Sequence, residues 1–203
     1  MAKRLFDVIV SAAMLLVLWP LLLLVALLVK WDSPGPVFYR QERVGRREVS
    51  FRIHKFRTMR HGSGGLPITV GTDARVTRSG AFLRRTRLDE LPQLFDVLVG
   101  DMSLVGPRPE VPRYVAHYPP ALRAVALSIR PGMTDPASLS FIDEAALLAA
   151  SPDPERTYIE QILPAKVAQA AAYAQRASLL SDLLVLGRTA GVLLLRLFRP
   201  GGA

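Results

Sequence analysis

The sequence predicts a mainly helical α+β protein that sits in one face of a membrane, with an N-terminal re-entrant helix-break-helix, a small β-hairpin and interfacial amphipathic helices. Three observations predict this class. No charged residue occurs between Val8 and Val29. Apolar and polar residues alternate after Gly45, whereas helical spacing dominates from about residue 81 onward. Finally, a net charge of +9 and a pI near 10.6 accompany a mean hydropathy of +0.26, a combination that favours an anionic, membrane-surface partner.

The uncharged N-terminal run is long enough to cross a bilayer at the ~1.5 Å rise per residue of an α-helix. Pro20 lies near its middle and removes a backbone donor, which predicts a kink or break. Basic residues flank both ends, as Lys3 and Arg4 before the run and Lys30 after it, and this favours both ends on the cytoplasmic side. Two arrangements stay open: a helix-break-helix that enters and leaves one leaflet, or a single spanning helix kinked at Pro20. We assign residues 1–32 to this membrane helix and residues 33–203 to one further domain.

The segment after the membrane helix predicts a β-hairpin. In "VFYRQERVGRREVSFRIHKF" two extended stretches surround Gly45, and Val49, Phe51 and Ile53 alternate with polar residues. His54 falls on the polar face, where we expect a structural or exposed side chain rather than a ligand. The following "HGSGGLPITVGTD" predicts a flexible loop.

A helix that begins near Asp89 follows, preceded by a helical segment from about Ala81. Proline is tolerated in the first turn of a helix and is costly further in, so Pro92 places the start close to Asp89. Gly100 marks its end. The following residues share helical spacing and are predicted to form one buried face: Leu88, Leu91, Leu94, Phe95 and Leu98.

The C-terminal part is mixed over residues 134–160 and helical from about Pro164. In its last segment Arg188, Arg196 and Arg199 fall on one helical face, and leucines and valines cover the remainder. This pattern is typical of a helix in the membrane interface, and a buried terminal helix is the alternative.

Composition excludes several chemistries. The absence of cysteine excludes disulfides, thiol catalysis and cysteine-ligated zinc. The chain has no GxxxxGK[ST], GxGxxG, HExxH or GxSxG motif. With 7% aromatic residues and no known nucleic-acid-binding motif, we expect no nucleic-acid partner; phospholipid or a phosphorylated small molecule remains.

One carboxylate pair, Asp89 and Glu90, stands directly after Arg84, Arg85 and Arg87. Such a pair is commonly a solvated, salt-bridged helix start. Beside a membrane element it could instead carry phosphate chemistry, one carboxylate attacking phosphorus and the other holding Mg²⁺. The candidate phosphate-binding residues are Lys55, Arg57, Arg75, Arg84 and Arg108. From the residues alone, a membrane-anchored phosphohydrolase or pyrophosphatase and a non-enzymatic basic scaffold also remain open.

Four motifs carry a family resemblance. "KFRTM", "DARVTRSGAFLRRTRLDELPQL", "GDMSLVGPRPE" and "RPGMT", in that order behind the apolar segment, resemble the bacterial sugar transferases, the monotopic phosphoglycosyl transferases that start lipid-linked glycan assembly. The resemblance implies transfer of a sugar 1-phosphate from a UDP-sugar to polyprenol (undecaprenyl) phosphate at the cytoplasmic face of the bacterial inner membrane, with release of UMP. It leaves the sugar undetermined and a homodimer open.

The resemblance also implies residue roles. Asp89 would form a covalent phosphosugar intermediate, and Glu90 would help to bind Mg²⁺. The basic residues of the family motifs correspond to Lys55, Arg84 and Arg108. Two stretches depart from the pattern: Trp19 precedes Pro20 where the family has a Ser-Pro pair, and residues 135–145 follow "RPGMT" with an unrelated sequence. No sugar specificity carries over to that second stretch.

Overall fold

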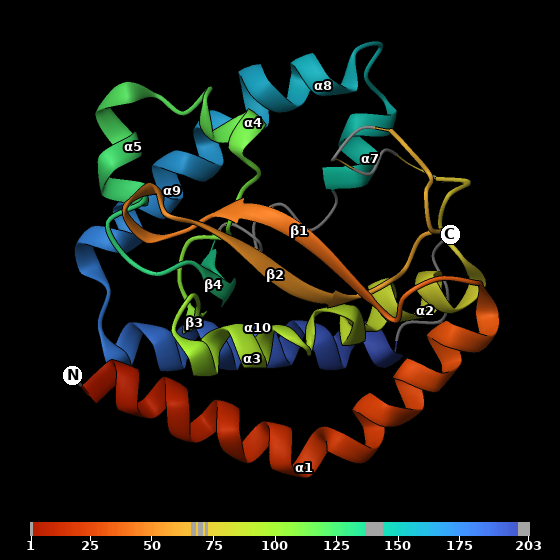
Figure 1. The fold of residues 1–203 in the computed structure, drawn as a ribbon. Coiled ribbons are helices and arrows are strands. Elements are labelled where there is room, and N and C mark those ends of the chain that lie inside the picture. The colour runs from red at the N-terminus through yellow and green to blue at the C-terminus, as the bar shows by residue number, and fades with distance from the viewer. Residues whose placement is uncertain (1, 66–67, 69–70, 72, 137–143, 199–203) are drawn as a thin grey trace.

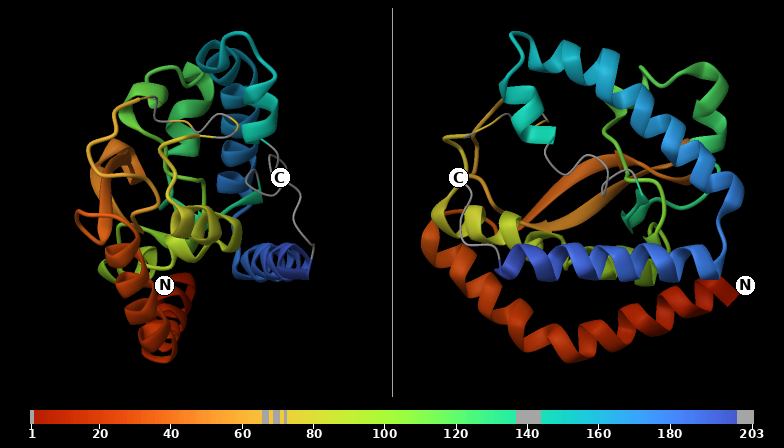
Figure 2. Two further views of the ribbon diagram at one scale, coloured as in Figure 1. Left: turned by 90° about the vertical axis from the view of Figure 1, so that its right-hand side faces the viewer. Right: turned by 180° about the vertical axis from the view of Figure 1, so that it is seen from behind.

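The computed structural model describes residues 2–65, 68, 71, 73–136 and 144–198. They form a mainly helical structure with a small antiparallel sheet, which confirms that part of the predicted fold class. The hairpin lies across the centre of the molecule, with α2, α3 and α10 beneath it, α5, α8 and α9 above it, and α1 at the bottom (Figures 1 and 2). The elements are α1 (Ala2–Asp32), β1 (Phe38–Val44), β2 (Ser50–Phe56), α2 (Arg78–Thr86), α3 (Gln93–Val99), β3 (Ser103–Val105), α4 (Pro112–Val115), α5 (Pro120–Ala126), β4 (Gly132–Thr134), α7 (Glu144–Ala149), α8 (Pro154–Thr157), α9 (Leu163–Arg176) and α10 (Leu179–Phe198).

Helix α1 is bent and not broken. It runs through Pro20 without interruption, and Figure 1 shows the bend near its middle, with both arms rising towards the rest of the molecule. The predicted break is therefore corrected to a bend, because proline removes one donor while the neighbouring turns keep their hydrogen bonds. By length and composition α1 could cross a membrane, and 11% of its most apolar window is buried.

Both ends of α1 are held by the same domain. Arg4 donates to the carbonyls of Val97 and Leu98, at 2.5 and 2.9 Å. At the other end, the Asp32 carboxylate accepts from the backbone N–H and the hydroxyl of Ser79, at 3.0 and 2.7 Å. The two ends of the apolar helix therefore lie on one side of its bend.

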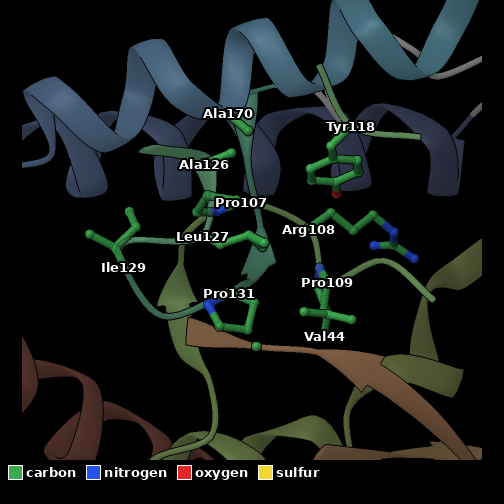
Figure 3. Close-up of a pocket in the computed structure, with 11 residues that line it drawn as sticks. Val44, Pro107, Arg108, Pro109, Tyr118, Ala126, Leu127, Ile129, Pro131 and Ala170 are labelled. Carbon is green, nitrogen blue, oxygen red and sulfur yellow. The ribbon is translucent and has the colours of Figure 1, made fainter. Parts of the chain in front are cut away.

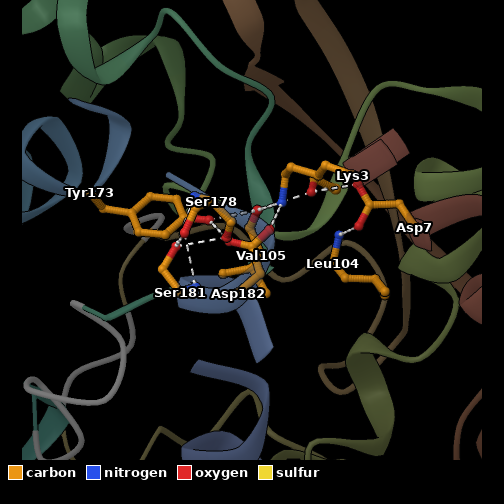
Figure 4. A network of polar contacts seen from close by, with 9 residues as sticks. Lys3, Asp7, Leu104, Val105, Tyr173, Ser178, Ser181 and Asp182 are labelled. Atoms are coloured by element: carbon orange, nitrogen blue, oxygen red, sulfur yellow. Dashed lines mark hydrogen bonds and ion pairs between the residues drawn. The ribbon is translucent and has the colours of Figure 1, made fainter. Parts of the chain in front are cut away.

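A polar network joins the start of α1 to β3, α9 and α10 (Figure 4). Lys3 donates to the Val105 carbonyl at 3.0 Å and pairs with Asp182, which also accepts from the Tyr173 hydroxyl. The buried Asp7 accepts from the Ser103 hydroxyl at 2.8 Å. These contacts fix β3, and with it the loop that follows.

The predicted hairpin is confirmed. β1 pairs with β2 antiparallel from Phe38 opposite Phe56 to Val44 opposite Ser50. Arg47 and Glu48 in the turn adopt left-handed φ values of 55° and 65°. The Arg47 N–H donates to the Leu127 carbonyl at 2.7 Å, so the tip of the hairpin is attached to the end of α5.

A parallel pair, β3 with β4, brings two of the sequence motifs together. Ser103 pairs with Gly132 and Val105 with Thr134. The backbones cross so closely that a Cβ on Gly132 would lie 2.1 Å from the Gly106 nitrogen. Glycine is required at this crossing because there is no room for a side chain.

The helices around the carboxylate pair differ from prediction in detail. α2 begins at Arg78, where Thr77 caps it by accepting from the Gly80 N–H, and α3 ends at Gly100 with a φ of 101°. Of the predicted buried face, Leu94 is buried, whereas Leu88, Leu91 and Leu98 are partly exposed. The prediction is wrong at Phe95, which is 49% exposed. Asp96 and Val97 are buried instead, because Asp96 binds a residue of β2.

The C-terminal segment, predicted to be helical from about Pro164, forms two helices, α9 and α10. Asp182 and Val185 of α10 are buried, whereas Leu180 and Leu184 are 70% and 59% exposed. α10 is therefore a surface helix with an apolar outer face and not a buried terminal helix. Arg188 is exposed, while the side chain of Arg196 and the whole of Arg199 lie outside the described structure.

Candidate functional site

The carboxylate pair lies in a short 3₁₀ turn, η2 (Leu88–Glu90), between α2 and α3. Arg87 ends α2 in the left-handed conformation, with a φ of 59°, and so redirects the chain before the pair. Asp89 and Glu90 are 7% and 8% exposed. Burial of two adjacent carboxylates is costly unless cations compensate them. The neighbouring cations form ion pairs with Glu90 and not with Asp89.

Glu90 is the ion-paired member. Its Oε1 accepts from Arg108 at 2.6 Å and Lys55 at 2.8 Å, and Arg87 lies 3.6 Å away. Burial opposes ionisation of Glu90, but the charges of Arg108, Lys55 and Arg87 outweigh it and hold its pKa well below the usual range. Glu90 is therefore a fixed anion.

Asp89 is the unpaired member. Within the described part of the chain its buried Oδ1 has no hydrogen-bond partner. Burial and the adjacent Glu90 carboxylate raise the pKa of Asp89 to about 6, against the opposing charges of Lys55, Arg87 and Arg84. Two neighbouring acids thus differ in their ease of ionisation because the cations meet only one of them directly.

The position of Lys55 depends on an anchor next to it in β2. His54 donates its backbone N–H to Asp96 Oδ2 at 2.9 Å, and its Nδ1 lies 2.6 Å from Asp96 Oδ1. This pair fastens β2 to α3 and agrees with the structural role predicted for His54. Burial lowers the pKa of Lys55, and the Glu90 charge opposes that effect.

Arg108 reaches Glu90 from the loop between β3 and α4. The Gly132 N–H donates to the carbonyl of Pro107 at 2.9 Å, which ties this loop to β4. The Glu90 charge raises the pKa of Arg108. Figure 3 shows the guanidinium pointing away from a small apolar pocket of about 10 Å³ behind the loop. That volume holds about one water molecule, so the pocket is too small to bind a substrate.

Arg84 lies beside the pair, whereas Arg75 is farther out. Arg84 donates through Nε to the Thr58 hydroxyl at 2.9 Å. Burial lowers its pKa, and Asp89 is the strongest opposing charge. Arg75 donates to the Asp73 carboxylate through Nε at 2.9 Å and Nη2 at 2.6 Å, and it also donates to the Gly64 carbonyl.

Arg57 is engaged elsewhere. All five of its N–H groups have acceptors at the end of α1 or just after it, namely Val29 O, Ser33 O, Ser33 Oγ, Pro34 O and Pro36 O. A contact between Arg57 and phosphate would require these bonds to break. The structure thus brings Lys55, Arg84 and Arg108 to the pair and places the side chain of Arg57 at the end of α1.

Sequence reasoning did not select three residues that shape the site. Arg87 pairs with Glu90, and the spacing of three residues on one turn could have identified it. Arg43 and Glu110 hold the Arg108 loop through an ion pair across 67 positions, for which no local pattern exists.

Comparison with known proteins supports the resemblance. The family model described as "Bacterial sugar transferase" matches residues 1–196. A UDP-glucose:undecaprenyl-phosphate glucose-1-phosphate transferase of Xanthomonas campestris pv. campestris is 52% identical over 120 residues, covering 58% of this chain and 25% of that protein. The exopolysaccharide production protein PSS of Rhizobium leguminosarum bv. phaseoli is 54% identical over 109 residues, covering 52% and 54%.

A third relative differs in its named donor. The UDP-N-acetylgalactosamine-undecaprenyl-phosphate N-acetylgalactosaminephosphotransferase of Aeromonas hydrophila is 46% identical over 118 residues, covering 57% of this chain and 28% of that protein. The match with these three relatives therefore spans between a quarter and about half of their length. Because the family model covers almost the whole chain, from the apolar helix to α10, the chain belongs to the bacterial sugar transferase family.

Proposed function

We propose that this chain transfers a sugar 1-phosphate from a UDP-sugar to polyprenol phosphate through a covalent intermediate on Asp89. The observation that carries the proposal is the contrast between two adjacent buried carboxylates, one ion-paired and one unpaired, among Lys55, Arg84, Arg87 and Arg108. The donors and the undecaprenyl phosphate acceptor named for the relatives are consistent with it.

In the first step an Asp89 oxygen attacks the phosphorus that bears the sugar. A bond forms between this oxygen and phosphorus, the bond from phosphorus to the bridging oxygen breaks, and UMP leaves with that oxygen and the electron pair. Asp89 suits this role because it is ionised above about pH 6 and no hydrogen bond occupies its Oδ1. Lys55 and Arg108, held in place by Glu90, would stabilise charge on the phosphate oxygens.

In the second step a phosphate oxygen of polyprenol phosphate attacks the same phosphorus. The new bond completes a diphosphate, and the bond to Asp89 breaks and returns the carboxylate. No proton has to be moved in either step.

The carboxylates fit a magnesium ion. All contacts of the Glu90 carboxylate fall on Oε1, which leaves Oε2, and Asp89 Oδ1 also lacks a donor. Mg²⁺ is usually held by one or two carboxylates together with substrate phosphates, and the described residues contain no larger group of metal-binding side chains. When bound, Mg²⁺ would neutralise phosphate charge, with Glu90 as the principal protein ligand.

We further propose that α1 enters one leaflet and returns, with the site at the cytoplasmic face of the inner membrane. Both ends of α1 bind the same domain, and the side chains around its bend are exposed and apolar, including Leu16, Val17, Trp19 and Leu23. The exposed leucines of α10 would then lie against the same membrane surface.

Intact-mass spectrometry of the purified protein with Mg²⁺ and a panel of UDP-sugars tests the chemistry. We expect an added mass of one sugar phosphate with the correct donor, lost in Asp89→Asn and with EDTA, and discharged by polyprenol phosphate. Absence of any adduct together with absence of UMP release in the presence of acceptor would refute the proposal. Without acceptor the proposal allows at most one UMP per protein molecule, so continued UMP release without acceptor would identify a hydrolase.

Single-cysteine labelling tests the topology, since the natural chain has no cysteine. Ala2 and Asp101 are both exposed. We expect neither the Ala2→Cys nor the Asp101→Cys variant to react with an impermeant maleimide in intact cells, and both to react after lysis. Labelling of Ala2→Cys alone in intact cells would show a spanning helix.

A further inference from the structure

The carboxylate of Glu110 joins three separate parts of the chain. Its Oε1 accepts from Arg43 Nη1 at 3.2 Å and from the Val111 N–H at 2.9 Å. Its Oε2 accepts from the Tyr158 hydroxyl. Glu110 stands two positions after Arg108, so these contacts act on the loop that presents Arg108 to Glu90.

Arg43 is the link between Glu110 and the hairpin. Its Nη1 also donates to the Pro109 carbonyl at 3.0 Å, and Nη2 donates to the Gln41 side chain at 2.7 Å. The Val44 N–H donates to the Glu110 carbonyl at 2.9 Å, so the backbone of β1 binds the same loop. Pro109 and Glu110 are thereby fixed on one side of Arg108, as Gly132 fixes Pro107 on the other.

Arg43 depends on Glu110 electrostatically. Its side chain is largely buried, and burial lowers its pKa while the Glu110 charge opposes this effect. Arg108 is a second cation nearby and repels it. Without the Glu110 charge, Arg43 would be a buried cation whose one ion-pair partner among the described residues is lost.

Tyr158 holds Glu110 from the opposite side. It lies in a π-helical turn, η3 (Tyr158–Ile162), and is buried. Its ring packs against Tyr114 at 4.9 Å between centroids, and Lys166 Nζ lies 5.2 Å above it. Lys166 pairs with Glu144 at the start of α7. Such π-turns occur frequently at functional sites.

We propose that Glu110 is a positioning residue, which holds Arg43 and the Pro107–Pro109 loop so that Arg108 meets Glu90 and the donor diphosphate. The inference rests on the proposed function for the identity of the ligand. The contacts of Glu110 with Arg43 and Tyr158 do not depend on that function. Glu110 touches no reacting atom, and its effect should pass entirely through Arg108.

The test compares Glu110→Gln and Tyr158→Phe with Glu155→Gln. Glu155 is the matched control, because it also binds a tyrosine and an arginine, Tyr114 and Arg113, but does not contact the loop. We expect Glu110→Gln to raise the KM for the UDP-sugar about tenfold with a smaller fall in kcat, Tyr158→Phe to raise it about threefold, and Glu155→Gln to leave it unchanged.

A double-mutant cycle separates positioning from general loss of structure. In an Arg108→Ala background, Glu110→Gln should raise KM no further. UDP binding by calorimetry gives a readout that needs no turnover, and its Kd should weaken in parallel. Unchanged KM and Kd in Glu110→Gln, or an effect that adds fully to that of Arg108→Ala, would overturn the inference. UDP binding that follows the expected pattern without any transferase activity would instead count against the proposed function alone.

Discussion

Replacement of Asp89 by Asn should abolish turnover and at the same time stabilise the protein above pH 6. Burial and the Glu90 carboxylate raise the pKa of Asp89 from 3.8 to about 6, so the folded state resists ionisation that the unfolded chain undergoes readily. Each pKa unit corresponds to about 1.36 kcal/mol, which gives about 3 kcal/mol of destabilisation for the ionised group. Asn has almost the same shape and carries no charge.

The pH dependence follows from the sign of the shift. Below the unfolded pKa, Asp89 is protonated in both states and the substitution should be nearly neutral. As the pH rises from about 4 to 6, only the unfolded state loses its proton, so wild-type stability falls relative to Asp89→Asn. Above pH 6 the difference should be constant. For a chain of 203 residues, about 3 kcal/mol corresponds to roughly 6–12 °C in Tm.

Thermal unfolding followed by circular dichroism at pH 4 and pH 8, in one detergent, measures this difference. Asp101→Asn is the matched control, because it makes the same substitution at an exposed position. The Asp89→Asn variant should exceed wild type at pH 8 and not at pH 4. Equal Tm values for the two variants at pH 8 would refute the claim that Asp89 is held in an unfavourable ionised state.

Three further predictions concern the residues around the site. Glu90→Gln should lower stability at pH 8 by about 3–5 kcal/mol in denaturant unfolding, because it leaves buried cations without their anion; an unchanged midpoint would contradict the ion-pair geometry. Arg57→Met should destabilise the protein and loosen the end of α1 in hydrogen exchange, whereas Arg60→Met, at an exposed position, should have no effect on either. Gly132→Ala should reduce UMP release at least tenfold, because its Cβ would meet the Gly106 nitrogen at 2.1 Å and displace the Arg108 loop; near-normal release would argue against this loop as part of the site.

Secondary structure could be predicted from the sequence where neighbouring residues determine it. Alternation in β2 predicted the hairpin, because that signal acts within a few residues. Pro92 correctly marked the approach to a helix, but α3 begins at Gln93 and not near Asp89, and the carboxylate pair lies in the 3₁₀ turn before it. The same local reasoning failed for Phe95. Helical spacing predicts which residues share a face, but Asp96 takes the buried position because it binds His54 across 42 positions.

The sequence did not predict which distant basic residues meet at the carboxylate pair. Lys55 and Arg57 are two positions apart and would share a face in a continuous strand, yet β2 ends at Phe56 and Arg57 turns to the carbonyls after α1. Both were candidates from the residues alone, and only the family resemblance favoured Lys55 over Arg57. The difference in ion pairing between Asp89 and Glu90 was likewise not predictable from composition. It depends on which carboxylate Arg108 reaches, and the close backbone contact between Gly106 and Gly132 sets the position of the Arg108 loop.

The bend of α1 is a property of the whole molecule and not of Pro20 alone. A straight helix of 31 residues would be about 46 Å long, whereas α1 is bent and attached to the same domain at both ends. The polar contacts that retain it, from Arg4 and from Asp32, are concentrated at those ends, while the apolar side chains around the bend are exposed. Proline lowers the cost of bending by removing one hydrogen bond, and the tethers at the two ends select the bent form. The same tethers reach α2 and α3, the helices on either side of Asp89, so the placement of the apolar helix and the placement of the carboxylate pair are set by one group of contacts.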